Sequence, residues 1–394
     1  MYILSKEKLL LDLYYAFQCA KKHKPSKKYV KDFESDLHNN LVSLCDELYE
    51  RRYVPLPSIC FIVTKPKKRE IFAANFRDRI VHHLYYNYTY ELFNRTFIED
   101  SYSCRNGKGT HYGIHRLEMH IRQESENYTK PTYVLKMDIK GYFIHINRIL
   151  LLRFVNNTLD KMMYRKDINN KIKYCDIIDF DFIKYLSEVI ILLNPIENTI
   201  IRSKKNEWKT LDKSKSLFYS GKDCGLPIGN LTSQLFSNVY LNILDQYIKR
   251  VLHCKHYGRY VDDFYIVSKD KNFIKSLITK IDDFMKSNLF LELQNKKTRI
   301  VNINQGVEFL GAFVKPYRTY ISNTTVKRMR KNLYLFQTYK TENKTVTHMV
   351  NSYLGILSHY KSHKIKKNII NETPRIKQYG YFINNYSKFI EIKI

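Results

Sequence analysis

The amino-acid sequence predicts an α+β fold, on three observations. Short runs of β-branched and aromatic residues alternate with helical periodicities through the middle of the chain. The run 258–267, which contains Asp262 and Asp263, is typical of two short strands joined by a tight turn. Residues 5–50 and 316–394 favour helices. Because 44% of the residues are hydrophobic, the chain can bury a core and is not disordered.

The elements are predicted in chain order from these patterns. Residues 5–50 form two amphipathic helices, separated by the basic stretch 21–28 with Pro25. The other predicted elements are strands at 59–64 and after the basic turn 65–71, helices at 78–93 and around His115, a strand at 133–137 that ends in Asp138, a helix after Gly141, two helical patterns and an irregular stretch within 155–220, a loop at 225–230, helices at 233–252 and 273–289, and strands at 299–303 and 307–314. A chain of 394 residues is longer than most compact domains, so two or three subdomains are expected.

The chain is strongly basic. Lys and Arg outnumber Asp and Glu by 67 to 38, which gives a net charge of +29. The basic residues are spread from end to end, so they are not a tail on a neutral domain. A charge of this size on a folded chain favours a polyanionic partner, and a nucleic acid is a better interpretation than a generic basic surface.

Cysteine usage and hydropathy indicate the compartment. The seven cysteines are scattered, and no two form a Cys-x-x-Cys pair. This usage predicts neither a disulfide framework nor a zinc site and is typical of the reducing cytosol. No apolar run reaches the ~18 residues of a membrane span. We therefore expect a cytoplasmic protein with no membrane partner and no signal peptide.

Asp262 and Asp263 are the first candidate functional residues. At the turn of a hairpin neither carboxylate needs to enter the core. Together they form a hard, oxygen-rich, anionic point, and Mg²⁺ prefers one or two carboxylates together with substrate phosphates. The alternative is an Asp-Asp turn on an ordinary surface hairpin, which the pair alone does not exclude.

Asp138 supplies a third carboxylate at the end of another strand. Three carboxylates on adjacent strands are what a two-metal phosphoryl-transfer site needs, since one ion activates the attacking hydroxyl and the other binds the triphosphate. The alternative for Asp138 is an N-cap of the helix that follows it.

The motifs around these acids resemble reverse transcriptases. Tyr260-Val261-Asp262-Asp263 looks like the signature of that family. Other motifs are similar and stand in the family order: 137–143 resembles the first aspartate motif, 225–234 the loop that contacts nucleotide and template, 291–298 the lysine-bearing motif, 307–311 the primer-grip hairpin and 65–79 the fingers strands. The resemblance implies a right-hand polymerase fold, with an N-terminal helical extension (1–55), fingers (56–132), a palm (133–315, with an insertion at about 155–222) and a helical basic thumb (316–394).

Residue roles follow from this resemblance. Asp138, Asp262 and Asp263 would hold two Mg²⁺ ions, or Mn²⁺ in their place, with the carbonyl of Ile139 as an extra ligand. Phe143 falls where the family keeps a bulky residue against the sugar 2′-position, and would select deoxynucleotides; ordinary helix core is the alternative. Lys297 would protonate the leaving pyrophosphate. The other predicted contacts are Lys65, Arg69, Gly229, Gln234 and Tyr260 for the nucleotide, with Arg69 favoured for the triphosphate, and Arg105, Lys108, Lys327, Arg328, Arg330 and Lys331 for nucleic acid. For Lys65, Arg69 and Lys297 the alternative is solvated surface charge.

The loop 228–234 indicates which branch of the reverse transcriptases the chain resembles. Retroviral and group II intron enzymes generally carry Gln-Gly-x-x-x-Ser-Pro here, whereas this chain has Ile228 at the first position and Gln234 at the last. This form is similar to diversity-generating retroelement enzymes and related bacterial groups, several of them antiphage defence systems. Because Ile228 lacks a polar amide near the templating base, reduced fidelity is a hypothesis. Equal misincorporation by wild type and Ile228→Gln would contradict it.

The resemblance implies an RNA-directed DNA polymerase. It would use dNTPs to make cDNA from a dedicated structured non-coding RNA, and antiphage defence is the predicted role. Mutagenic cDNA synthesis in a diversity-generating retroelement is one alternative, and a non-catalytic RNA-binding scaffold is another. An accessory protein or a second copy of the chain is left open as a further partner.

Overall fold

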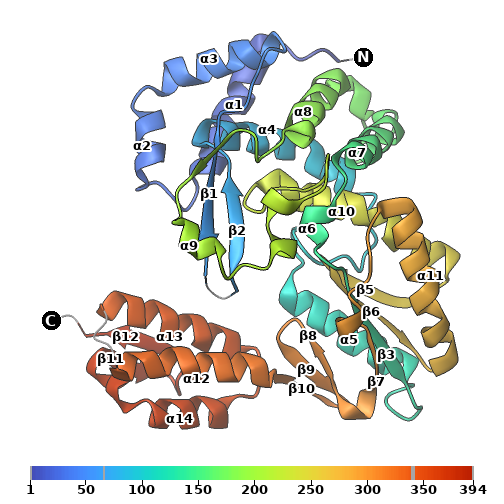
Figure 1. The fold of residues 1–394 in the computed structure, drawn as a ribbon, viewed down its shortest axis with the longest axis vertical. Helices are drawn as coiled ribbons and strands as arrows, with labels where there is room; N and C mark the ends of the chain where they lie inside the picture. The colour runs from blue at the N-terminus through green and yellow to red at the C-terminus, as the bar shows by residue number, and fades with distance from the viewer. Residues whose placement is uncertain (1, 65–66, 339–341, 393–394) are drawn as a thin grey trace. The chain divides into compact units, whose positions relative to one another are not determined.

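The computed structural model describes residues 2–64, 67–338 and 342–392 (Figure 1). Helices and mainly antiparallel strands both contribute, which confirms the predicted α+β class. The chain forms two compact units: unit 1 is Met1–Gly109, Met137–Phe264 and Ser276–Thr298, and unit 2 is Thr110–Lys136, Tyr265–Lys275 and Arg299–Ile394. The boundaries predicted between extension, fingers, palm and thumb stay predictions.

The N-terminal part of unit 1 is helical. Its helices are α1 (Lys6–Lys21), α2 (Lys28–Glu34), α3 (Leu37–Tyr49) and α4 (Phe76–Asn94). The second predicted helix is wrong as one helix, because the chain breaks it into α2 and α3 at Ser35 and Asp36. There the Ser35 hydroxyl donates to the carbonyl of Asp32, and Asp36 takes a non-helical φ of −132°. Phe17 of α1, Phe33 of α2 and Phe76 of α4 pack together, with ring centroids 5.5–6.2 Å apart.

A three-stranded sheet follows in the order β2-β1-β4. Its strands are β1 (Ser58–Val63), β2 (Arg69–Ala73) and β4 (Thr199–Ile201). The predicted pair β1 and β2 is antiparallel, with Val63 opposite Arg69. The parallel strand β4 was not predicted; it comes from the irregular part of the segment 155–220 and pairs through Ser58 and Thr199.

Helix α10 (Leu231–Gln246) lies in the core of unit 1. It packs against α4, where the rings of Tyr85 and Phe236 meet at 5.4 Å, and it continues into a π-helical turn, Tyr247–Val251. The predicted helix 233–252 is therefore an α-helix with a differently wound last turn. The neighbouring helices are α6 (Tyr142–His145), α7 (Arg148–Met163), α8 (Phe180–Leu192) and the short α9 (Lys205–Trp208).

A four-stranded sheet has the order β5-β6-β3-β7. Its strands are β3 (Tyr133–Asp138), β5 (His256–Tyr260), β6 (Asp263–Ser268) and β7 (Arg299–Asn302). Strands β3 and β7 are antiparallel, with Tyr133 opposite Asn302. Helices α5 (Thr110–Glu124) and α11 (Lys271–Leu289) agree with the predicted helices around His115 and at 273–289.

The C-terminal part of unit 2 holds two small sheets and three helices. The elements are β8 (Val307–Phe309), β9 (Ala312–Lys315), β10 (Arg318–Ile321), α12 (Asn323–Thr338), α13 (Asn343–Ser358), α14 (His363–Glu372), β11 (Gly380–Ile383) and β12 (Lys388–Glu391). The stretch 307–314 is a hairpin instead of one strand, because Leu310 and Gly311 turn the chain at φ 49° and 83°. The predicted helical thumb thus also contains the hairpin β11–β12.

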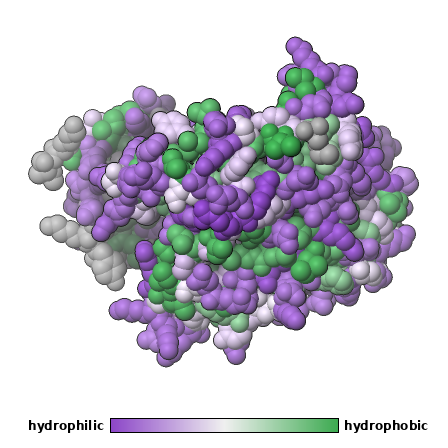
Figure 2. Space-filling view, turned by 90° about the horizontal axis from the view of Figure 1, so that it is seen from above, coloured by the Kyte–Doolittle hydropathy of each residue, from purple (hydrophilic) through white to green (hydrophobic). Residues whose placement is uncertain are grey.

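None of the helices in the described ranges is long and apolar enough to cross a membrane. Hydrophilic residues cover much of the face seen in Figure 2, as expected for a chain with 27% charged residues.

Candidate active site

The turn between β5 and β6 carries Asp262 and Asp263, as predicted. Val261 opens the turn with φ 55°, a conformation that a β-branched residue seldom adopts. Both carboxylates are half-buried. Burial raises the pKa of Asp262 to about 6, and the charges of Asp138 and Asp263 add to this effect. Asp262 therefore lies close enough to both Asp138 and Asp263 to be repelled by them.

Asp138 ends β3 and is held by the segment that follows α11. The carbonyl of Asp138 accepts from the amide of Gln294 at 2.8 Å, and the amide of Lys140 donates to the carbonyl of Glu292 at 3.0 Å. Lys297, two residues before β7, places its Nζ 2.8 Å from each carboxylate oxygen of Asp138. Its side chain is 58% exposed, so the ion pair is only partly shielded from solvent.

The donor set suits a divalent cation. Lys297 pairs with Asp138. Asp262 lies near the carboxylates of Asp138 and Asp263, whose charges add to the effect of burial in raising its pKa. Such hard oxygen donors are the ligands that Mg²⁺ prefers. Ile139 and Leu293 form an isolated antiparallel bridge. The two hydrogen bonds of this bridge are those of Asp138 with Gln294 and of Lys140 with Glu292, so the carbonyl of Ile139 takes part in neither. Within the described ranges, however, no three acidic, histidine or cysteine side chains form a ready-made metal site, and the metal stays a prediction.

A buried ion pair supports the turn. The side chains of Arg259 and Asp245 are both 0% exposed and join Nη2 to Oδ2 at 2.6 Å. Arg259 also donates from Nη1 to the carbonyl of Val261 at 3.0 Å, and the Tyr257 hydroxyl donates to Asp245 at 2.6 Å. Burial alone would lower the pKa of Arg259, but the charge of Asp245 and its hydrogen bond raise it, so the guanidinium stays charged. The left-handed residue of the turn is thus tied to the core through Arg259.

The loop before α5 holds the same turn from another side. The amide of Val261 donates to the hydroxyl of Ser103 at 3.2 Å, and the amide of Arg259 donates to the carbonyl of Asp100 at 2.9 Å. Asn238 of α10 fixes the loop by donating to the carbonyl of Ser103 at 2.9 Å. Both backbone polar groups of Val261 therefore have partners that pin the turn.

Sequence reasoning missed Arg259, Asp245 and Ser103. Arg259 is the one charged residue of β5, and a charge inside a strand of aromatic residues was a signal that it needs a buried partner. Nothing in the sequence connected it to Asp245 of α10 or to Ser103.

Phe143 lies in the first turn of α6. Gly141 immediately precedes the helix with φ 54°, and a Cβ there would lie 2.7 Å from the His145 ring, so this position needs glycine. The carbonyl of Phe143 accepts from the amide of Leu226 at 2.8 Å, which ties α6 to the loop 225–230. The ring is half-buried, so Phe143 is not a fully buried core residue.

The loop 225–230 docks on β2. The amide of Phe72 donates to the carbonyl of Ile228 at 3.0 Å, and the amide of Ala74 donates to the side chain of Asn230 at 3.0 Å. Gly229 has φ 136°, and a Cβ there would lie 3.0 Å from the carbonyl oxygen of Phe72. Gly229 therefore allows close packing against β2. Gln234 is exposed on α10 and Tyr260 is half-buried at the end of β5, so their predicted nucleotide contacts stay predictions.

Of the two residues predicted to bind the triphosphate, the structure describes one. Arg69 is exposed at the first residue of β2, while Lys65 lies outside the described residues. The next residue, Glu70, is buried and accepts from Trp208, Ser216 and the amide of Leu217 at 2.6–2.8 Å. Glu70, which sequence reasoning also missed, thus anchors the segment 205–217 to the strand that carries Arg69.

Arg105 and Lys108 contact their own loop, and their predicted nucleic-acid contacts stay predictions. The guanidinium of Arg105 donates to Asn94 at 2.7 Å and to the carbonyls of Ile98 and Ser101 at 2.6 and 3.0 Å, so its donors hold the loop itself. Lys108 likewise lies 2.9 Å from the carboxylate of Glu99. Both side chains serve the fold of the loop in this structure.

The basic cluster of unit 2 lies on α12. Lys327, Arg328, Arg330 and Lys331 are all exposed there. Arg330 is paired with Glu372 of α14 at 3.0 Å. This cluster is described within unit 2 alone, and its predicted contact with nucleic acid stays a prediction.

Comparison with known proteins identifies a family and a curated relative. Residues 63–314 match the family "Reverse transcriptase (RNA-dependent DNA polymerase)". Among curated proteins, the chain is 24% identical to Protein YkfC of Escherichia coli (strain K12) over 305 residues, which cover 68% of this chain and 69% of that protein.

Similar solved structures include telomerases from two Candida species. Apo telomerase from Candida tropicalis has a TM-score of 0.47 at 13% identity, covering 82% of this chain and 57% of that one. The same protein truncated from its C-terminal domain has a TM-score of 0.44 at 12% identity, covering 68% and 55%. Telomerase from Candida albicans in complex with the TWJ fragment of telomeric RNA has a TM-score of 0.43 at 12% identity, covering 84% and 61%. This chain spans less than two thirds of each telomerase chain.

Proposed function

The chain belongs to the family of reverse transcriptases, which are RNA-directed DNA polymerases, and we propose that it copies an RNA template into DNA by two-metal nucleotidyl transfer. Its α+β fold is the right-hand polymerase fold of that family. The observation that carries the proposal is the gathering of Asp138, Asp262 and Asp263, with the pKa of Asp262 raised to about 6. Carboxylates that repel one another at a strand end and a hairpin turn favour the binding of divalent cations, for which they serve as ligands.

Each residue of the site has a role in this proposal. Asp138, Asp262 and Asp263 would hold two Mg²⁺ or Mn²⁺ ions, which when bound supply Lewis acidity for the attacking hydroxyl and the triphosphate. Lys297 brings an ammonium to within 2.8 Å of Asp138, where it can offer a proton to the leaving pyrophosphate. Phe143, half-buried in the turn that follows Asp138, would exclude a ribose 2′-hydroxyl.

Primer extension on an RNA template tests this proposal. We compare wild type, Asp262→Asn/Asp263→Asn and the control Asp283→Asn, which removes an exposed carboxylate of α11. Wild type and the control should make Mg²⁺-dependent cDNA, and the double variant should make none while still binding the template. Absence of cDNA from wild type would contradict the proposal and favour the non-catalytic RNA-binding scaffold.

We further propose a dedicated structured non-coding RNA as template and antiphage defence as the role. The support is the form of the loop 228–234, with Ile228 and Gln234 at its ends. Sequencing the RNA that co-purifies with the chain should give one dominant species, and phage should plate less efficiently on cells with wild type than with Asp262→Asn/Asp263→Asn. Equal plating, together with cDNA that carries substitutions over its template, would favour gene diversification instead.

A further inference from the structure

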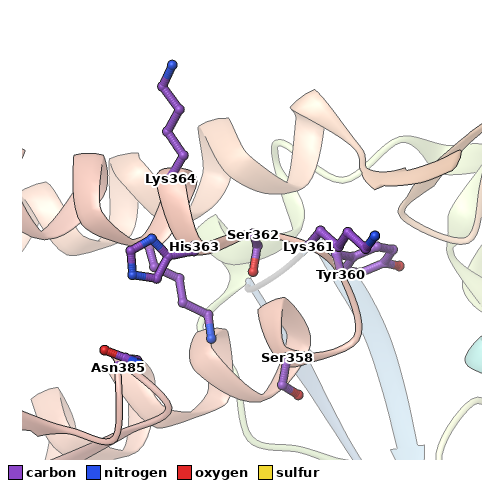
Figure 3. Close-up of a pocket in the computed structure, with 8 residues that line it drawn as sticks. Ser358, Tyr360, Lys361, Ser362, His363, Lys364 and Asn385 are labelled. Atoms are coloured by element: carbon purple, nitrogen blue, oxygen red, sulfur yellow. The ribbon is translucent and has the colours of Figure 1, made fainter.

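A basic pocket of about 480 Å³ lies in unit 2, away in sequence from every residue assigned above. Figure 3 shows residues from the end of α13, the start of α14 and the turn of the hairpin β11–β12 around it. The residues that line it include Ser358, Lys361, His363, Lys364, Lys366 and Asn385. None of the lining residues is acidic. Such a lining suits an anion.

Lys366 is the residue that requires an explanation. It is only 9% exposed and lines the pocket. In the part of the chain that the structure describes, no carboxylate lies within ion-pair distance of its ammonium. A lysine charge held at a pocket with no carboxylate beside it favours the binding of an anion there.

The start of α14 gives a second reason. Helix α14 has ten residues, and no side chain caps its N-terminus, because the hydroxyl of Ser362 donates to the carbonyl of Leu357 at 2.6 Å. Its first turn contains no acid, although acids are favoured at the positive end of a helix dipole. His363 and Lys364 stand there instead, and Figure 3 shows Lys364 extending away from His363 and Asn385. Free amides at a helix start are a known type of phosphate site.

We propose that this pocket binds a phosphate group of RNA. A phosphate offers several oxygens to the ammonium of Lys366 and the amides of α14, and the charge of +29 makes nucleic acid its source. The inference rests on the proposed function, since it assumes that RNA is the substrate. The phosphate is either the 5′-terminal group or one within the backbone.

A binding experiment on the full chain separates these sources. The probes are RNA hairpins of one sequence, labelled at the 3′-end, that carry a 5′-triphosphate or a 5′-hydroxyl. The variants are Lys366→Met, which keeps an unbranched side chain in the buried position, and Lys367→Met, which removes an exposed charge from the same helix outside the pocket. Thermal unfolding of each variant checks that it is folded, and Lys366→Arg serves as a charge-retaining second variant.

Lys366→Met should bind RNA about tenfold more weakly than Lys367→Met, since a charge-assisted contact is lost only in the former. A loss confined to the 5′-triphosphate hairpin identifies the terminal group, and an equal loss for both hairpins identifies a backbone phosphate. Equal affinities of Lys366→Met and Lys367→Met for both hairpins would overturn the proposal. Primer extension by wild type is measured separately, so a chain that binds RNA through Lys366 but makes no cDNA would contradict the proposed function alone.

Discussion

Arg259 connects the candidate active site to the core at the scale of single residues. Its guanidinium satisfies Asp245 and the carbonyl of Val261 at the same time. Removing one partner of a buried ion pair leaves an uncompensated charge, which costs about 3–5 kcal/mol. We therefore expect Arg259→Met to lower the free energy of unfolding by about that amount in urea titrations.

The double variant Arg259→Met/Asp245→Leu separates stability from positioning. With no buried charge left, it should regain most of the lost stability. Its primer extension should stay low, because the carbonyl of Val261 still lacks a donor and the Asp262–Asp263 turn is less fixed. Full recovery of activity together with stability would show that the pair serves the fold alone.

Phe143 is predicted to control sugar selection. If its half-buried ring excludes a 2′-hydroxyl, Phe143→Ala should raise the ratio of kcat/KM for ribonucleotides to that for deoxynucleotides by about tenfold or more. Steady-state incorporation of single nucleotides measures the ratio. Phe143→Tyr, which keeps the ring, should behave as wild type, and an unchanged ratio in Phe143→Ala would assign the ring to packing.

The sequence predicted the acids of the site better than their supports. Asp138, Asp262 and Asp263 follow from local patterns, since each stands at the end of a short run of strand-forming residues. Arg259–Asp245 and Glu70–Trp208 join residues 14 and 138 positions apart, and no local pattern specifies such a partner. The contacts of Arg105 within the chain were not predicted for the same reason, because two of its acceptors are backbone carbonyls of its own loop, which a sequence does not display.

At the scale of elements, α4 and α10 are joined by a buried histidine. The hydroxyl of Thr232 and Nδ1 of His82 share a hydrogen bond of 2.8 Å. Burial lowers the pKa of His82 to about 3 from its ordinary value of 6.5. Between these values the unfolded chain takes up a proton that the folded chain does not, so stability falls as the pH falls below 6.5.

This linkage gives a measurable pH dependence. From pH 7 to pH 5 wild type should lose about 2 kcal/mol of unfolding free energy through His82. His82→Gln should lack this part of the loss in urea titrations at the two pH values. His38→Gln, which changes an exposed histidine of α3, should keep it. An equal pH dependence in His82→Gln and His38→Gln would show that His82 is not the titrating group.

Local signals decided which elements could be predicted. The turn at Ser35–Asp36 escaped prediction because Phe33 and Leu37 keep an i, i+4 spacing across the break. Strand β4 has three residues and is paired with β1, which precedes it by about 140 residues, so only tertiary contact makes it a strand. The hairpin β11–β12 was not predicted, because its segment is basic like the helices before it and was assigned to the helical thumb.

At the scale of the whole molecule, the charge of +29 predicts binding that depends strongly on salt. Each phosphate that a basic side chain neutralises releases a counterion, and log K falls with log salt concentration by about 0.7–0.9 per contact. We do not expect the four basic residues of α12 to contribute equally to this salt dependence. Arg330 is already paired with Glu372, so part of its charge is compensated within the protein.

Charge removal on α12 tests this difference. Lys327→Gln/Arg328→Gln/Lys331→Gln should reduce the slope of log K against log salt concentration by about 2–3. Arg330→Gln should change it by less than one contact, since Glu372 competes with phosphate for the guanidinium. Titrations of labelled RNA between low and physiological salt measure the slopes. If Arg330→Gln lowers the slope by as much as one average residue of the triple variant, the ion pair with Glu372 opens on binding. If the triple variant keeps the wild-type slope, α12 does not contact nucleic acid.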